Sequence, residues 1–280
     1  MTERDPNALG DVAAFYAERL AKASNASGPA CCATPLLAPD YRKEALENLP
    51  QGVAESSFGC GDPLAFAGVE AGQTVLDLGC GAGLDLLLAA EKTGPDGRVI
   101  GVDASPEMLE RARRNAAEAG HSNIELLHGA IEELPVESAS VDWVISNCVI
   151  NLSMDKPAAF REIARVLRPG GTMVISDLVA EPLPDWLQVH RDLYAACVSG
   201  AVTEDAYRGF ASDAGLTDLK ILGAFDYDEA LVRRLIEDEL PAAVDALAAR
   251  LEMPSEAATA LLAQELSGKI RSIKLFGRRR

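Results

Sequence analysis

A glycine-rich turn with acidic neighbours is the first stretch of this sequence whose residue types could do chemistry. Residues 74–103 read TVLDLGCGAGLDLLLAAEKTGPDGRVIGVD. The turn contains three glycines: Gly79, Gly81 and Gly83. Residues without a Cβ let the chain bend from a strand into a helix and let a ligand approach the backbone closely. Asp77 precedes the turn and Asp103 ends the next apolar run, so a ligand with an ammonium group and a ribose fits better than one with phosphates. The spacing Gly-x-Gly-x-Gly also differs from the dinucleotide fingerprint, which makes NAD a weaker alternative.

The cysteines are the second set of candidate chemical groups. There are six: Cys31, Cys32, Cys60, Cys80, Cys148 and Cys197. None forms a Cys-x-x-Cys pair, and the three histidines show no ligand spacing, so a zinc site is not indicated. Cys148 directly follows an apolar run, Cys60 lies in a glycine-rich loop and Cys197 lies near the end of a predicted helix. We expect these three thiols to lie together at the opening of the ligand-binding cleft, because ligands of open α/β sheets bind beyond the carboxyl ends of the strands.

Alternating apolar runs and amphipathic stretches predict the elements that position these residues. Apolar runs and alternation indicate seven strands, at 75–78, 98–103, 123–127, 141–146, 173–176, 219–227 and 269–276. Helical periodicity occurs at 11–23, 41–49, 84–92, 106–119, 157–167, 184–198 and 206–214, and through an alanine- and leucine-rich stretch at 228–268. Arg168 to Gly171 is predicted as a turn, and the alternating closing strand as an edge strand. Strands that alternate with helices favour an α/β fold with a mostly parallel sheet.

Composition excludes several classes of partner. A formal net charge of −17 argues against nucleic acid and anionic membranes, both of which would repel the chain. The cluster Arg278–Arg280 is interpreted as a solvated tail. No apolar run reaches the roughly 18 residues of a membrane span, and the first ten residues do not form a signal peptide. We therefore expect a cytoplasmic location, where thiols stay reduced.

The turn and its acids resemble those of class I S-adenosylmethionine-dependent methyltransferases. The resemblance implies a Rossmann-like fold with a mostly parallel seven-stranded sheet, helices on both faces, an N-terminal helical and loop segment, and a helical insert before the last strand. It also implies that S-adenosylmethionine contacts Phe58, Asp77, Gly79, Gly81, Gly83, Asp103, Ala104, Met108, Ile131, Glu132 and Asn147. The segment 128–135 takes the adenine position. Phe58 departs from the Tyr that relatives often carry, which removes a hydroxyl near the cofactor.

Three thiolates without imidazoles suit a soft, thiophilic acceptor. Zinc would require a fourth ligand, whereas trivalent arsenic binds three sulfurs in a pyramid and keeps a lone pair. The segments FGCGDP, VLDLGCGAG, ISNCVINLSMDK and LYAACVSGA resemble the arsenite S-adenosylmethionine methyltransferase family of bacterial type, over roughly residues 12–225 and again at the closing strand. The resemblance implies that Cys148 and Cys197 bind arsenic with Cys60 as the third thiol.

Further expectations follow from the same resemblance. One cysteine of the doublet, Cys31 or Cys32, pairs with Cys60 in a redox reaction, or the doublet itself binds arsenic. Thioredoxin or glutathione then reduces the disulfide formed in turnover. Cys80 is interpreted as a small core residue. The partners expected are trivalent arsenic or its thiol adducts and thioredoxin, with no nucleic acid and no membrane.

Four regions are predicted: an N-terminal helix and cysteine-bearing loops at 1–70, a cofactor-binding core at 71–180, a substrate-covering region with the sixth strand at 181–227, and a helical insert with the final strand at 228–280. The helices of the insert are interpreted as a lid, a dimer surface or solvent-facing padding, and padding is favoured. Two other functions remain open. A methyltransferase of an organic small molecule would need an acid, a base or a histidine over the cleft, and a thiol-rich sequestering protein would have lost its cofactor residues.

Overall fold

The computed structural model of the protein describes residues 41, 45–46, 49–50, 52–54, 59, 61–183, 197–198, 200–239 and 241–280. Five predicted features lie wholly or mostly outside these ranges: the helix at 11–23, the doublet Cys31 and Cys32, Phe58, Cys60, and the helix at 184–198.

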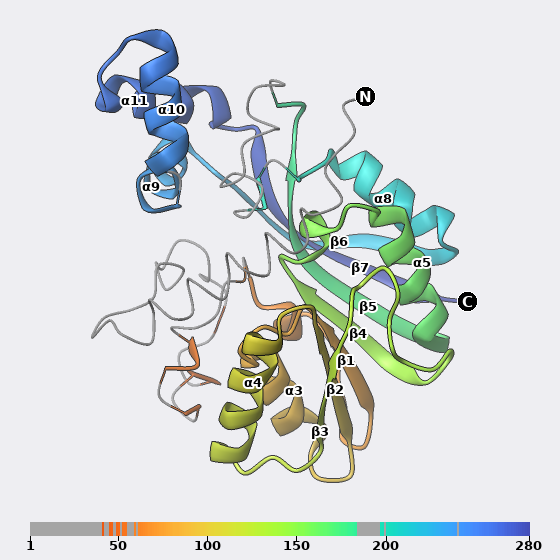
Figure 1. The fold of residues 1–280 in the computed structure, drawn as a ribbon. Coiled ribbons are helices and arrows are strands. Elements are labelled where there is room, and N and C mark those ends of the chain that lie inside the picture. The colour runs from red at the N-terminus through yellow and green to blue at the C-terminus, as the bar shows by residue number, and fades with distance from the viewer. Residues whose placement is uncertain are drawn as a thin grey trace.

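One seven-stranded sheet organises the described chain, with the strand order β3-β2-β1-β4-β5-β7-β6 (Figure 1). The strands are β1 (Thr74–Leu78), β2 (Arg98–Asp103), β3 (Ile124–His128), β4 (Val141–Asn147), β5 (Leu167–Ala180), β6 (Leu216–Asp226) and β7 (Ile270–Arg279). Strands β1 to β5 run parallel, and β7 runs antiparallel to both of its neighbours. The predicted α/β class is confirmed. The strand order reverses between β1 and β4, the point at which such sheets bind ligands.

Helices cover both faces of the sheet, as the sequence predicts (Figure 1). One face packs against α3 (Leu84–Thr93) and α4 (Pro106–Glu118), and the other against α5 (Lys156–Val166) and α8 (Glu204–Asp213). Apolar residues of the central strands point alternately into two clusters: Val75 lies among the α3 and α4 side chains, and Leu76 among those of α5 and α8. Burial on both faces explains why β1 and β4 are almost continuously apolar.

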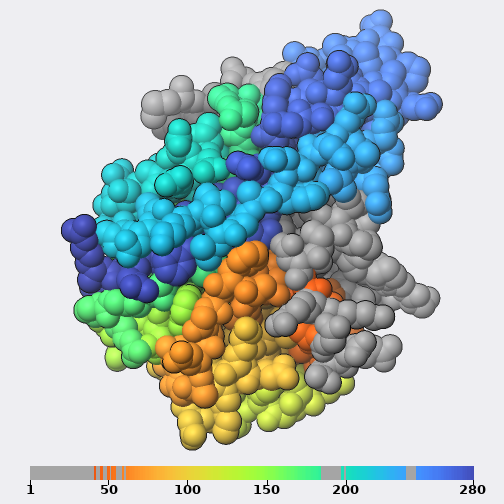
Figure 2. All heavy atoms as spheres, turned by 180° about the vertical axis from the view of Figure 1, so that it is seen from behind, coloured from red at the N-terminus to blue at the C-terminus, as the bar shows by residue number. Residues whose placement is uncertain are grey.

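Three further helices form an insert between β6 and β7. They are α9 (Glu229–Glu239), α10 (Pro241–Leu251) and α11 (Ser255–Leu266). In Figures 1 and 2 these helices stand out as a lobe beyond one end of the sheet. None of the helices in the described part of the chain is long and apolar enough to cross a membrane.

The structure corrects three local predictions. The closing strand is not an edge strand, because β7 lies between β5 and β6. Its alternation arises instead from buried polar residues, since Ser272 and Lys274 are 2% and 3% exposed. The basic end is solvated only in part: Arg278 and Arg280 are exposed, whereas Arg279 ends β7 and its guanidinium donates to the carbonyls of Arg165 and Leu167. The segment 168–171 belongs to β5, which absorbs the extra residues as a register shift against β4.

Candidate active site

The glycine turn after β1 has the backbone that the sequence predicts. Gly79, Gly81 and Gly83 all lie in the left-handed region, with φ of 63°, 51° and 96°. This conformation strains residues with a Cβ, which is why glycine is needed here. The amides of Gly79 and Cys80 donate to the carbonyl of Val102, so the turn is curled against the end of β2.

Asp103 fixes the same turn from the end of β2. Its carboxylate accepts a hydrogen bond of 2.8 Å from the amide of Gly81 and another of 2.8 Å from the amide of Ser105. Burial raises the pKa of Asp103, while these two amides oppose the rise. The second lone pair on each oxygen can still accept a ligand hydroxyl, as a ribose would require.

Asp77 supplies a buried carboxyl oxygen without a hydrogen-bond partner under the turn. It is 2% exposed, and its Oδ2 atom is one of the few buried side-chain oxygens in the described chain without a hydrogen-bond partner. Burial first, and then the charges of Asp85 and Asp103, raise the pKa of Asp77 well above its usual range. A buried acceptor without a partner is costly, so this position fits a bound cation such as the ammonium of S-adenosylmethionine.

Three segments meet at the side chain of Asn147, the last residue of β4. Its amide nitrogen lies 2.6 Å from the carbonyl oxygen of Gly61, 2.9 Å from the Tyr41 hydroxyl and 3.0 Å from Asp85 Oδ2. The Tyr41 hydroxyl also donates to Asp85 Oδ1 at 2.8 Å. Burial raises the pKa of Asp85 to about 7, although the hydrogen bonds from Asn147 and Tyr41 lower it. Asn147, predicted to contact the cofactor, thus also ties the N-terminal segment to the core.

The two glycines on either side of Cys60 are pressed against the sheet. A Cβ added to Gly59 would lie 2.2 to 2.6 Å from the amide group of Asn147. A Cβ added to Gly61 would lie 2.5 Å from Ser176 Oγ and 2.8 Å from Lys274 Cε. Only glycine permits this approach. The chain on both sides of Cys60 is therefore packed against the end of β4 and the adjacent part of β5, although Cys60 itself lies outside the described residues.

Two of the predicted thiol residues lie next to each other. The Cys197 thiol donates to the carbonyl oxygen of Cys148 at 2.9 Å, and the two residues are 3% and 7% exposed. Both have left-handed backbones, with φ of 57° for Cys148 and 60° for Cys197. A residue with a Cβ loses roughly 1–2 kcal/mol in this conformation, and such strain is concentrated at functional sites.

The described cysteines differ in redox state. Cys148 is disulfide-bonded, whereas Cys80 and Cys197 are free thiols. No group of three cysteine, histidine or acidic residues within the described ranges has the geometry of a metal site, and the third predicted thiol lies outside them. Cys80 belongs to the α3 and α4 cluster, and burial raises its thiol pKa well above the usual range. This agrees with its interpretation as a core residue.

The turn that carries Cys148 (the thiol turn) directly contacts the glycine turn that follows β1. A Cβ added to Gly79 would lie 2.3 Å from Cγ2 of Val149, the residue that follows Cys148. The structure therefore brings the predicted donor side and the predicted acceptor side of the cleft together.

Known proteins with a similar sequence or fold include methyltransferases. Residues 69–215, more than half of the chain, match the family described as "Methyltransferase domain". A crystal structure of CrArsM, an arsenic(III) S-adenosylmethionine methyltransferase from Chlamydomonas reinhardtii, superposes with a TM-score of 0.60 at 32% identity, and the match covers 89% of this chain and 74% of that chain. The chain belongs to the arsenite S-adenosylmethionine methyltransferase family.

Two curated members of this family share part of their length with the chain. The arsenite methyltransferase of Halobacterium salinarum is 48% identical over 169 residues, which are 60% of this chain and 43% of that protein. The human arsenite methyltransferase is 32% identical over 209 residues, which are 71% of this chain and 55% of that protein. The chain thus spans about half the length of these curated relatives.

The remaining positions predicted to contact the cofactor are Ala104, Met108, Ile131 and Glu132. Met108 is buried, Ala104 is exposed and its carbonyl contacts His128 Nε2 at 3.1 Å. Ile131 is buried, and Glu132 accepts a 2.5 Å hydrogen bond from the Ser153 hydroxyl. These positions stay predictions of cofactor contact.

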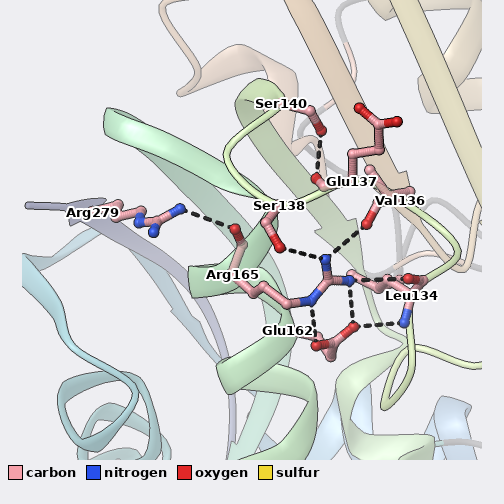
Figure 3. A network of polar contacts seen from close by, with 8 residues as sticks. All are labelled: Leu134, Val136, Glu137, Ser138, Ser140, Glu162, Arg165 and Arg279. Carbon is pink, nitrogen blue, oxygen red and sulfur yellow. Dashed lines mark hydrogen bonds and ion pairs between the residues drawn. The ribbon is translucent and has the colours of Figure 1, made fainter.

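A salt bridge on α5 that the sequence analysis did not predict holds the segment 134–138 (Figure 3). Arg165 donates to the carbonyls of Leu134 and Val136 and to the Ser138 hydroxyl, at 2.8 to 3.1 Å. Glu162 pairs with Arg165 at 2.7 Å and accepts from the amide of Leu134 at 2.7 Å. The Glu-x-x-Arg spacing on α5 was the signal available, because residues three apart on a helix are neighbours.

The helical insert packs into the same apolar cluster as Cys148 and Cys197. One apolar cluster contains Cys148 and Cys197 together with side chains of all three insert helices, among them Val232, Leu247 and Leu262. The favoured interpretation of the insert as solvent-facing padding is therefore wrong. The insert shares an apolar cluster with the two cysteines, and the sequence could not show this because the insert carries no motif.

Proposed function

We propose that this protein transfers methyl groups from S-adenosylmethionine to trivalent arsenic held by cysteine thiolates. The observation that carries the proposal is the pairing of Cys197 with Cys148, with a hydrogen bond of 2.9 Å between them, directly beside the glycine turn. Cys60, flanked by two glycines pressed against the same end of the sheet, is proposed as the third thiol.

The residues of the cleft fit the methyl donor. Asp77 offers an unsatisfied buried carboxylate oxygen to an ammonium, and Asp103 is held in place to accept from a ribose. When bound, S-adenosylmethionine would supply a sulfonium methyl group. The protein's task is then to place the acceptor in line with that methyl, and well-oriented reactants gain several kcal/mol from positioning alone.

The thiols have two tasks in this scheme. As thiolates they displace hydroxide from arsenite, and they leave the arsenic lone pair free to accept the methyl. Methylation raises arsenic formally from the trivalent to the pentavalent state. Two thiolates return two electrons by forming one disulfide, which restores trivalent arsenic. An external thiol reductant, thioredoxin or glutathione, then reduces the disulfide. The disulfide at Cys148 is consistent with such a cycle. A cytoplasmic location, where such reductants act, is part of the proposal.

The alternative is methylation of an organic acceptor, for which Asp85 is the candidate base because its pKa is about 7. Both of its oxygens, however, accept hydrogen bonds from Tyr41 and Asn147, so the carboxylate is already engaged within the protein. The third possibility, a sequestering protein without a working cofactor site, does not fit a turn and acids that keep the geometry described above.

The proposal is tested by incubating the purified full chain with arsenite, a dithiol and methyl-labelled S-adenosylmethionine. We expect methylated arsenic from the wild type, and none from Cys148→Ser or Cys197→Ser. Phenol and amine acceptors run in parallel distinguish the organic alternative. Transfer of label to those acceptors but not to arsenic would overturn the proposal.

A further inference from the structure

Asp177 is a buried carboxylate close to the turn that carries Cys148, and none of the roles above uses it. Asp177 on β5 is fully buried and accepts four hydrogen bonds. The donors are the Asn151 amide at 3.2 Å, the Asn151 side chain at 2.8 Å, the Leu178 amide at 2.8 Å and the Tyr207 hydroxyl at 2.8 Å. A carboxylate with this many donors at this depth is an expensive group to bury, and its position calls for an explanation.

The first arm of this network reaches Cys148. Asn151 lies in the short 3-10 helix η3 (Ile150–Leu152) that begins two residues after Cys148. Its side-chain amide also donates to the carbonyl of Leu178 at 2.7 Å, and the Cys148 amide donates to the carbonyl of Ser176 at 2.8 Å. Three consecutive residues of β5 therefore hold the turn that carries Cys148. A residue with a strained left-handed backbone, such as Cys148, persists only when several surrounding contacts hold it in place.

The second arm reaches Tyr207. Tyr207 lies on α8, is fully buried and is bonded to Asp177 through its hydroxyl. Burial, then the charge of Asp177 and the hydrogen bond to it, raise the pKa of Tyr207 well above its usual range, so the hydroxyl stays protonated and donates to Asp177. The Cys197 thiol donates to the Cys148 carbonyl, so Cys197 joins the network through the turn that carries Cys148.

A lysine balances the charge of the carboxylate. Lys156, at the start of α5, is 6% exposed and donates to the carbonyls of Asn151 and Ser153 at 3.2 and 3.1 Å. Burial raises the pKa of Asp177 to about 6, while the Tyr207 hydroxyl, the Leu178 amide and the charge of Lys156 lower it. Asp177 is consequently ionised at neutral pH and can accept all four hydrogen bonds.

We propose that Asp177, itself held by the Tyr207 hydroxyl, is a positioning residue: it holds the turn that carries Cys148, and with it the Cys197 thiol that donates to the Cys148 carbonyl, in the geometry that presents arsenic to the methyl donor. The inference rests on the proposed function, since it assigns a role within the same site. Asp177 touches no substrate atom and acts through the backbone of the thiol turn.

The test compares two variants with a matched control. Asp177→Asn keeps the shape but places an amide against the Asn151 amide, and Tyr207→Phe removes a single hydrogen bond from a buried ring. Asp142→Asn is the control, because Asp142 is also buried and accepts a backbone hydrogen bond, from Thr74, but at the opposite end of the sheet. Tyr207→Phe decides the question if Asp177→Asn does not fold.

Two readouts are measured on the reduced full chain. The first is the KM for arsenite against the KM for S-adenosylmethionine. We expect the arsenite KM to rise roughly tenfold in Asp177→Asn and less in Tyr207→Phe with the donor KM unchanged, because misplacement of reacting groups is costly. The second is the rate at which Cys148 reacts with a neutral thiol reagent, followed by peptide mass spectrometry. We expect this rate to rise several-fold in both variants and to stay unchanged in Asp142→Asn.

The two readouts separate failure of the inference from failure of the proposed function. The inference is overturned if the Cys148 reaction rate in Asp177→Asn and Tyr207→Phe matches that of the wild type, or if both KM values rise together. A wild type that makes no methylated arsenic contradicts the proposed function, and the reaction rates of Cys148 then still decide whether Asp177 positions this thiol.

Discussion

The contact of Gly61 with β5 allows a quantitative prediction about the segment that carries Cys60. In Gly61→Ala the new Cβ would lie 2.5 Å from Ser176 Oγ and 2.8 Å from Lys274 Cε. Real Cβ atoms do not approach so closely, so the segment or its neighbours must shift. Lys274 can move its flexible chain, whereas Ser176 is fully buried in a central part of β5. Overpacking of this kind costs about 1–3 kcal/mol of unfolding free energy.

Removal of the Ser176 hydroxyl should relieve most of this cost. We expect Gly61→Ala to destabilise the Ser176→Ala background by about 1–2 kcal/mol less than it destabilises the wild type, measured by denaturant unfolding in a double-mutant cycle. The arsenite KM should rise in Gly61→Ala and fall back in the double variant. Gly209→Ala is the control, because its Cβ would meet nothing within 4 Å and alanine is favoured in a helix. A cycle with no coupling between the two positions would show that Gly61 does not pack against β5 as described.

Three further predictions concern single groups. Burial raises the pKa of Asp177 from 3.8 to about 6, so the stability linked to its proton is present below about pH 4 and is lost as the pH rises through 6. This rise of roughly two in the pKa corresponds to about 3 kcal/mol. The unfolding free energy of the wild type minus that of Asp177→Asn should therefore fall by about that amount from pH 4 to pH 7. A difference independent of pH would contradict the burial of the Asp177 carboxyl group. Asp77→Asn should weaken S-adenosylmethionine binding, measured by calorimetry, by roughly ten- to a hundredfold, because a hydrogen bond to a charged group is lost; unchanged affinity would remove Asp77 from the site. Cys80→Ala should keep arsenite methylation and lose about 1 kcal/mol of stability through its buried thiol, and loss of activity at normal stability would show that Cys80 takes part in the chemistry.

The cofactor side of the cleft could be predicted from the sequence because its signals are local. Asp77, the glycine turn and Asp103 lie within one stretch, and the backbone of a strand–turn–helix unit dictates which residues the turn accepts. The structure confirms the glycine turn and its place between β1 and α3, with Asp103 bonded to Gly81, and contact with the cofactor stays a prediction. The helix predicted at 106–119 also depends on a local signal, since Ser105 caps α4 and Pro106 takes its first position.

The links between distant segments could not be predicted in the same way. Asn147 bonds to Tyr41 and to Asp85, residues 106 and 62 positions away, and no periodicity connects them. The available signals were isolated polar residues in apolar stretches, such as Asp85 in α3 and Asp177 in β5. The position of β7 inside the sheet was missed for a related reason, because the same alternation describes an edge strand and a strand whose polar side chains are buried at a cleft.

The central claim is that the chain methylates arsenic held by its own thiols. It is tested most directly in a single turnover, with the reduced full-length chain loaded with arsenite and then given one equivalent of methyl-labelled S-adenosylmethionine. The account predicts that the label appears on arsenic, as methylarsenite after reduction, and that Cys148→Ser gives none. Arsenite and S-adenosylmethionine that both bind to the wild type while no label reaches arsenic would contradict it.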